Sequence, residues 1–413
     1  MRVHGVASVE RVVTEALARD SSVVLEGAQI VHHDHIVAQP LAVDDGRVAA
    51  DPSRYAFRVD LRDHLILPGL INAHDHLQLN NIPGLPHAEP FPNSYAWIGA
   101  FEAHMGRGDV EAAVAIPREV RHWHGALKNV LAGATTVAHH DPWYAILDEP
   151  DFPVGLLRDF GWSHSLGLGM PRDNLPPLYG PPVVESFVKT NVDRPWIIHL
   201  AEGIDDVAQS ELGHLDVLGC LAPNSVLVHG VGLTASDVAR IIERNAAVVW
   251  CPASNVSLFG ATLSPRALFS ARRLALGSDS RLTGSRDLLD EAGVAAAHSD
   301  LSPRELMRMM TVDAADILRL DGRGSLARGN RADCVILASD GDPYEALLNT
   351  TRASIRAVVR SGRPVVADPD FATWFEHSGV AAVPIRVDGC IKLVAATIAL
   401  PEAMQLEPGL EII

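Results

Sequence analysis

The chain has 413 residues, of which 47% are hydrophobic and 21% charged, and its formal charge is −17. This is the balance of a soluble globular protein with room for two or three folding units, and the negative charge argues against nucleic acid or an anionic membrane as partner. No apolar run reaches the ~20 residues that cross a bilayer, and the N-terminus has no secretory pattern. We therefore expect a cytoplasmic protein with a small-molecule partner; assembly of identical copies is compatible with the sequence.

The first elements in chain order are a helix and a set of short strands. Residues 8–18 have a helical period, and from about residue 22 the pattern changes to short β segments separated by turns. An apolar strand in LINAHDH then leads into His74 and His76. Side chains two apart on a strand point to the same side, and neutral imidazoles are common metal ligands. This pair predicts a metal site.

Strand-like and helix-like segments alternate from there to about residue 320. Helix-like stretches such as 233–245 and 302–320 lie between or after strand-like runs, and His229 follows His199 by thirty residues, which suits one βα unit. We expect an α/β fold in which residues 67–328 form a (β/α)8 TIM-type barrel. β character returns after residue 329, so residues 1–66 and 329–413 are expected to combine into a small β-sandwich domain.

Polar residues stand where several of these apolar runs end. They are His199 and Glu202 in PWIIHLAE, His229 in SVLVHG and Asp279 in LALGSDS. The C-terminal ends of barrel strands are where catalytic groups of such enzymes lie. Each motif alone is weak, since a lone buried histidine more often has a structural role. The pairs His32/His33 and His122/His124 do not follow an apolar strand, so we expect them at the surface.

The order of the motifs is more specific than any one of them. LPGLINAHDH, HLAE, VHG, CPASN and GSDS in succession resemble the amidohydrolase superfamily, in particular its cytosine, guanine and S-adenosylhomocysteine deaminases and triazine hydrolases. The tail GSLARGNRADCVIL is similar to the segment by which that family re-enters its β-sandwich. The resemblance covers residues 22 to 366. It implies a divalent metal with four ligands, which are His74, His76, His199 and Asp279.

The resemblance also implies roles in catalysis. Glu202 matches the proton-shuttling acid, and His229 matches the residue that contacts the metal-bound water or the substrate. Asp279 would take the proton of that water as hydroxide attacks an sp² carbon. Asp75 faces away from the metal on a strand and is expected to be structural. We expect hydrolytic deamination of an amino-substituted heterocycle with release of ammonia. A cyclic amide or imide hydrolase and a chlorohydrolase are alternatives, and a non-catalytic binding protein is a remote one.

Lysine usage favours one metal ion over two. Binuclear relatives commonly bridge their ions with a carboxylated lysine at a strand end, whereas none of the three lysines here ends a barrel strand: Lys128, Lys189 and Lys392. Three histidines and a carboxylate suit zinc, our first choice, and also iron(II) or manganese(II). The four cysteines are scattered and are expected to be reduced thiols.

One region departs from the family pattern. Only 66 residues separate Gly133 from His199, and the proline-rich segment 173–187 lacks a recognisable strand and substrate loop. A barrel strand is trimmed here, or the pocket is more open. Each candidate substrate contact also has a structural alternative, such as packing for Trp143 and an outward salt bridge for Arg281. The candidates are His140, Trp143, His164, Asn255 and Arg281.

Overall fold

The structure is a computed structural model that describes residues 22–168, 180–339 and 341–413. The helix expected at residues 8–18 and part of the proline-rich segment lie outside these ranges. Two parallel sheets form the centre of the molecule. The three-stranded sheet has the order β10-β9-β8, and the five-stranded sheet runs from β11 to β15 in chain order. Their bounds are β8 Leu70–Asp75, β9 Ala134–His139, β10 Gly155–Leu156, β11 Gly161–Trp162, β12 Trp196–Leu200, β13 Ser225–His229, β14 Ala247–Trp250 and β15 Leu274–Leu276.

These sheets confirm the expected parallel α/β arrangement. The segment after β15 returns to β8, because the amide of Asp279 donates to the carbonyl of His74 at 3.0 Å. Between β10 and β11 lie only residues 157–160, without a helix. The sequence is short here because the helix between these two strands is missing, whereas the strands β10 and β11 are both present. Within the described residues the hydrogen-bonded ladders do not close into the expected eight-stranded barrel.

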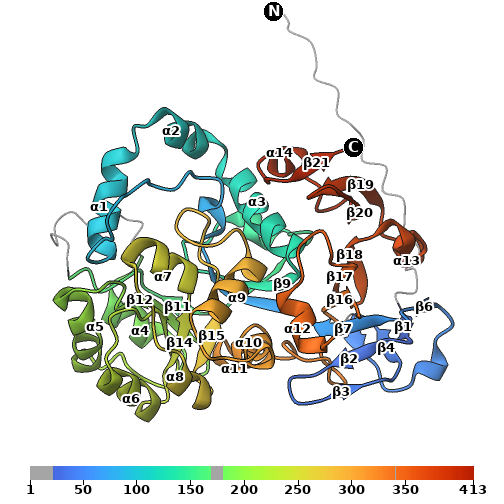
Figure 1. The fold of residues 1–413 in the computed structure, drawn as a ribbon, viewed down its shortest axis with the longest axis horizontal. Coiled ribbons are helices and arrows are strands. Elements are labelled where there is room, and N and C mark those ends of the chain that lie inside the picture. The colour runs from blue at the N-terminus through green and yellow to red at the C-terminus, as the bar shows by residue number, and fades with distance from the viewer. Residues whose placement is uncertain (1–21, 169–179, 340) are drawn as a thin grey trace, which may run out of the picture.

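Helices cover the outside of the parallel strands (Figure 1). Several have strong N-terminal caps: Thr234 with Asp237 and Ser302 with Glu305 form capping boxes, which satisfy backbone N–H groups that the helix cannot pair. The helices up to β16 are α1 Ser94–His104, α2 Gly108–Ala115, α3 Arg118–Leu131, α4 Val183–Lys189, α5 Asp206–Val217, α6 Ala235–Glu243, α7 Pro252–Phe259, α8 Arg266–Ser270, α9 Leu288–Ala297, α10 Pro303–Met309 and α11 Val312–Ile317.

A second β region joins the two ends of the described chain. β7 (His64–Pro68) pairs antiparallel with β16 (Cys334–Ala338) inside a sheet of order β21-β19-β20-β18-β17-β16-β7-β2-β3. A four-stranded sheet of order β5-β4-β1-β6 lies beside it (Figure 1). The remaining elements are β1 Val23–Glu26, β2 Gln29–Val31, β3 Ile36–Val37, β4 Leu41–Asp44, β5 Arg47–Val48, β6 Arg58–Asp60, β17 Ala357–Arg360, β18 Arg363–Ala367, β19 Ala382–Val387, β20 Cys390–Ala395, β21 Leu410–Ile412, α12 Pro343–Leu348, α13 Ala372–His377 and α14 Pro401–Met404.

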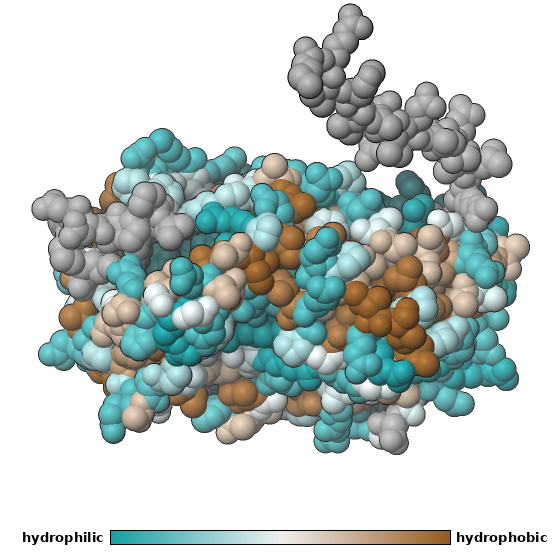
Figure 2. All heavy atoms as spheres, turned by 90° about the horizontal axis from the view of Figure 1, so that it is seen from above, coloured by the Kyte–Doolittle hydropathy of each residue, from teal (hydrophilic) through white to brown (hydrophobic). Residues whose placement is uncertain are grey.

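One apolar core runs through both regions. Leu127 of α3, Ile198 of β12 and Val358 of β17 belong to the same cluster of buried side chains. The face drawn in Figure 2 is mostly hydrophilic, with apolar side chains gathered in separate patches. Among the helices of the described ranges, none is long and apolar enough to cross a membrane. The core therefore holds the parallel strands and the second β region together.

Helix α3 departs from expectation at its histidines. His122 and His124, expected at the surface, are fully buried. The imidazole Nε2 of His124 lies 2.9 Å from the carboxylate of Glu407. The two histidines were expected at the surface because no apolar strand precedes them in the sequence. Helix α3 is instead packed between the parallel strands and the C-terminal segment, so nearly every face of the helix is covered.

Candidate active site

Four side chains converge where the parallel strands end. His74 lies on β8 and His76 directly after it, His199 on β12, and Asp279 just past β15. The Nε2 atom of His199 lies 3.3 Å from Nε2 of His74 and 3.2 Å from Nε2 of His76. Oδ1 of Asp279 lies 3.7 Å from Nε2 of His74 and 3.8 Å from Nε2 of His76. The structure thus brings together the four ligands expected from the sequence.

The ring orientations show that this cluster suits a cation. Nδ1 of His76 lies 2.6 Å from a carboxylate oxygen of Asp141, and Nδ1 of His199 lies 2.8 Å from the carbonyl of His164. Both acceptors require an N–H, so in the neutral rings both Nε2 lone pairs point to the centre, where they cannot satisfy one another. Zinc–nitrogen bonds of about 2.0–2.1 Å in a tetrahedron place ligand nitrogens about 3.3 Å apart. The observed separations fit such an ion.

Asp141 contacts the histidine cluster, and the sequence interpretation missed it. Burial lowers the pKa of His76, but the attraction and hydrogen bond of Asp141 outweigh it and raise this pKa to about 9. Burial likewise opposes ionisation of Asp141, yet His76 lowers its pKa. Carboxylates that orient metal-binding histidines in this way raise the basicity of the ligand. The signal was Asp141 in AHHDP, two residues beyond β9.

Asp279 is held in a strained backbone conformation. Its φ is +53°, in the left-handed region that non-glycine residues rarely adopt. Its Oδ2 accepts hydrogen bonds from Ser254 at 2.8 Å and from Thr283 at 2.7 Å, which leaves Oδ1 facing the histidines. Burial raises the pKa of Asp279, but His76 and His229 outweigh it and lower the pKa overall. Asp279 is therefore preorganised as an ionised carboxylate.

Glu202 and His229 lie together on the other side of the cluster. Oε1 of Glu202 is 3.5 Å from Nε2 of His229, whose Nδ1 lies 2.9 Å from Oδ1 of Asn255. Burial raises the pKa of Glu202, which favours the protonated carboxyl. A protonated carboxyl can act as a general acid, so a raised pKa suits Glu202 to that role. Asn255, a candidate substrate contact, instead orients His229.

Lys128 lies beneath the cluster and ties two of its segments together. Its side chain is fully buried on α3, and its Nζ lies 3.0 Å from Asp75, 2.8 Å from Oδ1 of Asn80 and 3.2 Å from the carbonyl of Asp279. These neighbours are acceptors, so all three N–H groups of an ammonium are used. The sequence interpretation correctly placed Lys128 on a helix but did not foresee its reach. Asp75, expected to be structural, is the partner of this ammonium.

A cavity of about 440 Å³ opens beside the cluster. Its inner end is formed by the cluster side chains, and one wall is apolar and includes Trp97 and Phe101 of α1 and Leu282. His164 lines this cavity, as one of the expected alternatives had it. Side chains of α1, which no sequence motif singled out, therefore shape the space for a substrate.

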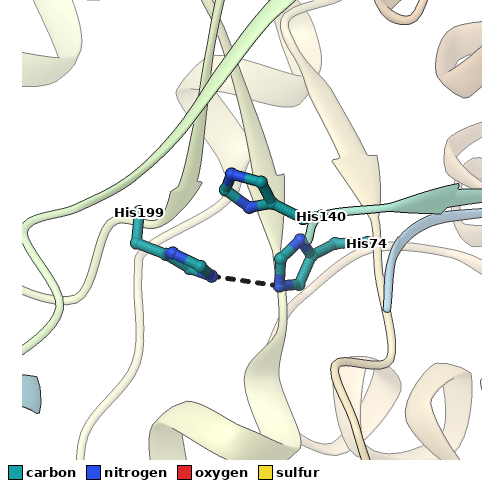
Figure 3. Close-up of side chains that lie close together, drawn as sticks. All are labelled: His74, His140 and His199. Atoms are coloured by element: carbon teal, nitrogen blue, oxygen red, sulfur yellow. Dashed lines mark hydrogen bonds between the residues drawn. The ribbon is translucent and has the colours of Figure 1, made fainter. Parts of the chain in front are cut away.

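The other candidate substrate contacts lie outside the lining of this cavity. His140 is buried against His74 and His199, with its Nε2 3.1 Å from the carbonyl of Ser163 (Figure 3). Trp143 is 37% exposed and hydrogen-bonds Asp148. Arg281 forms a two-pronged ion pair with Glu407. Support describes the position of His140. Arg281 forms a salt bridge, but to the fully buried Glu407 rather than outward as expected, and Trp143 is exposed rather than packed.

Comparisons with known proteins identify the family of the chain. A family model described as the amidohydrolase family matches residues 184–365. A 5-methylthioadenosine/S-adenosylhomocysteine deaminase of Syntrophobacter fumaroxidans is 31% identical over 381 residues, which cover 78% of this chain and 84% of the relative. The enzyme of the same description from Pyrococcus furiosus is 25% identical, with 86% and 97% covered.

Solved structures show the same architecture. An atrazine chlorohydrolase of Arthrobacter aurescens TC1 complexed with zinc has a TM-score of 0.69 at 19% identity and covers 86% of this chain and all of its own. An adenosine deaminase from Xanthomonas campestris with bound zinc has a TM-score of 0.65 at 20% identity, with 86% and 97% covered. The fold is accordingly TIM-barrel-like. As its motif order predicts, the chain belongs to the amidohydrolase family, in the branch of these deaminases.

Proposed function

We propose that the protein is a metal-dependent aminohydrolase that removes an amino group from a heterocycle and releases ammonia. The observation that carries this proposal is the buried carboxyl of Glu202, with a raised pKa, beside three converging histidines and an ionised aspartate. The named relatives are deaminases of adenine-containing compounds, which supports C–N hydrolysis as the reaction class.

The residues present fit one divalent ion, and zinc is the ion we propose. His74, His76, His199 and Asp279 would hold it, because their free donor atoms face one point. When bound, such an ion acts as a Lewis acid that makes a water molecule nucleophilic at neutral pH. One wall of the cavity beside these residues is apolar.

The protein side chains would then move protons. Asp279 accepts the proton of the attacking water, since its carboxylate is ionised and faces the histidines. Glu202 gives its proton to a ring nitrogen or to the departing amine, and Asp279 passes the water proton to the other of the two. The C–N bond then breaks, the amine leaves as ammonia, and the hydroxyl proton left on the product oxygen restores Glu202. His229, fixed by Asn255, stabilises the developing tetrahedral centre through the oxygen that becomes bonded to the carbon under attack.

We also propose the finer architecture expected from the sequence. Residues 67–328 would form a closed (β/α)8 barrel, and residues 1–66 and 329–413 a β-sandwich. The pairing of β7 with β16, within one sheet that contains strands from both chain ends, supports this division. A cytoplasmic location remains part of the same proposal.

Ammonia release tests the proposed function. Zinc-loaded protein should release one ammonia per turnover from at least one amino-substituted purine, pyrimidine, pterin or triazine, and Glu202→Gln with normal zinc content should not. Chloride release from a chlorotriazine would favour the chlorohydrolase alternative, and ring opening of a cyclic imide would favour the amidase. Turnover in none of these assays with zinc-loaded protein would support a binding protein and reject our proposal, and activity that persists after zinc removal would reject the metal-dependent mechanism.

A further inference from the structure

Two arginines of α3 line the cavity without an anionic partner. Arg121 is only 6% exposed, and its guanidinium donates to the carbonyls of Ile116 and Gln78, both at 3.1 Å. Arg118 lies near the wall of the same cavity with its guanidinium over the ring of Tyr144, 4.5 Å from the ring centroid. Among the described residues, neither arginine has a carboxylate within ion-pair distance.

This is unusual for a buried guanidinium. The chain has 51 acidic and 34 basic residues, so carboxylates outnumber cations. The other buried arginine of the described ranges, Arg352, pairs with both Glu407 and Asp388. Buried charges are normally paired, because an uncompensated charge in a low-dielectric interior costs several kcal/mol. Burial and the neighbouring Arg118 accordingly lower the pKa of Arg121. Glu119, the nearest acidic neighbour in sequence, is exposed.

The position of Arg121 relates it to the chemistry. Its Nη1 contacts the backbone of Gln78, whose side-chain amide donates to Asp141 at 2.6 Å, and Asp141 orients His76. The guanidinium therefore shares one cavity with the proposed metal ligands. Asp141 contacts His76 and Gln78, and among the described residues no ion pair joins it to Arg121.

We propose that the substrate carries an anionic group, a carboxylate or a phosphate, that Arg121 and Arg118 bind while the amino-bearing carbon lies at the histidine cluster. Guanidinium groups match both anions in geometry and charge. The apolar wall formed by Trp97, Phe101 and Leu282 would contact the heterocycle between these ends. The inference rests on the proposed function, because it assigns the substrate class of the same site.

Binding of matched ligands tests it independently of turnover. Purine, pyrimidine, pterin and triazine rings without an amino group, each bearing a carboxylate, a phosphonate or a carboxamide, are titrated into zinc-loaded protein by calorimetry. We expect an anionic member to bind roughly 10–100-fold more tightly than its carboxamide, the scale of hydrogen bonds to a charged group. Whether the carboxylate or the phosphonate binds more tightly shows which of the two anionic groups the substrate carries. If no anion binds more tightly than its carboxamide, the proposal is wrong, whether or not the enzyme releases ammonia.

Variants assign the effect to the arginines. Arg121→Gln should abolish the preference for the anion, and Arg118→Gln should reduce it at least several-fold, with zinc content unchanged. Arg158→Gln is the matched control, because Arg158 is exposed and pairs with Asp148. An unchanged anion preference in Arg118→Gln and Arg121→Gln overturns the assignment. If Arg121→Gln does not fold, Arg118→Gln decides the question alone.

Discussion

Replacing Lys128 by methionine removes the ammonium that joins the two ligand-bearing strand ends. Lys128 and Asp75 are both fully buried and 3.0 Å apart. Methionine keeps most of the volume but leaves the Asp75 carboxylate buried without a counter-charge, and breaking such a pair costs about 3–5 kcal/mol. A domain is stable by only about 5–15 kcal/mol, so this loss is a large part of the total. Urea unfolding of the metal-free protein should show it.

The same substitution should weaken zinc binding beyond its effect on stability. Lys128 donates to the carbonyl of Asp279, whose φ of +53° needs support from its surroundings. Loss of such supporting contacts typically lowers metal affinity 10–100-fold. Competition with a chelator at a temperature where both proteins are folded measures this effect separately.

A double mutant supplies the control. Asp75→Asn leaves an unpaired buried ammonium, whereas Asp75→Asn with Lys128→Met leaves neither charge. The double mutant should therefore be less destabilised than the sum of the two single variants. A free energy of unfolding within 1 kcal/mol of wild type for Lys128→Met, or strict additivity, would refute the reasoning.

The remaining predictions concern the metal and the proton carrier. Purified protein should hold about one zinc per chain by elemental analysis. Two equivalents at full occupancy would contradict the single-ion site that we infer from the lack of a bridging lysine. His199→Ala should lose the metal and the activity together. Glu202→Gln should keep its metal while kcat falls by roughly 10²–10⁴; loss of zinc would make Glu202 a ligand instead. Asp141→Asn should weaken zinc binding 10–100-fold in chelator competition, because the orienting carboxylate of His76 is lost. Burial raises the pKa of Glu202, so its protonated form persists to higher pH than that of a free glutamate. The kcat should therefore fall as the pH rises through this raised pKa.

The strand-end positions could be predicted because each has a local signal. An apolar run followed by a histidine or an aspartate identifies β8, β12, β13 and β15, and the spacing of two between His74 and His76 places both on one side. The motif order then supplied Glu202. These residues depend on their own strand and on little else, so their neighbourhood in the sequence is informative.

The contacts between distant segments could not be predicted in this way. Lys128 reaches Asp279, and Arg281 reaches Glu407, across more than 120 residues each. Periodicity marks an amphipathic helix but not which neighbour covers its polar side, so the buried His124 on α3 was expected at the surface. Helix α1 lines the cavity only because the segment after His76 folds back over the strands, which no local pattern in the sequence indicates.

The left-handed backbone at His229 and Asp279 has a consequence for the life of the protein in a cell. Their φ values of +78° and +53° oppose folding by about 1–3 kcal/mol each, and glycine, which would relieve the strain, cannot supply the side chains. A ligand that binds only the folded state adds stability in proportion to the logarithm of its free concentration. Zinc supply would then control how much of this protein escapes proteolysis, so its abundance should follow metal nutrition even when its synthesis is constant.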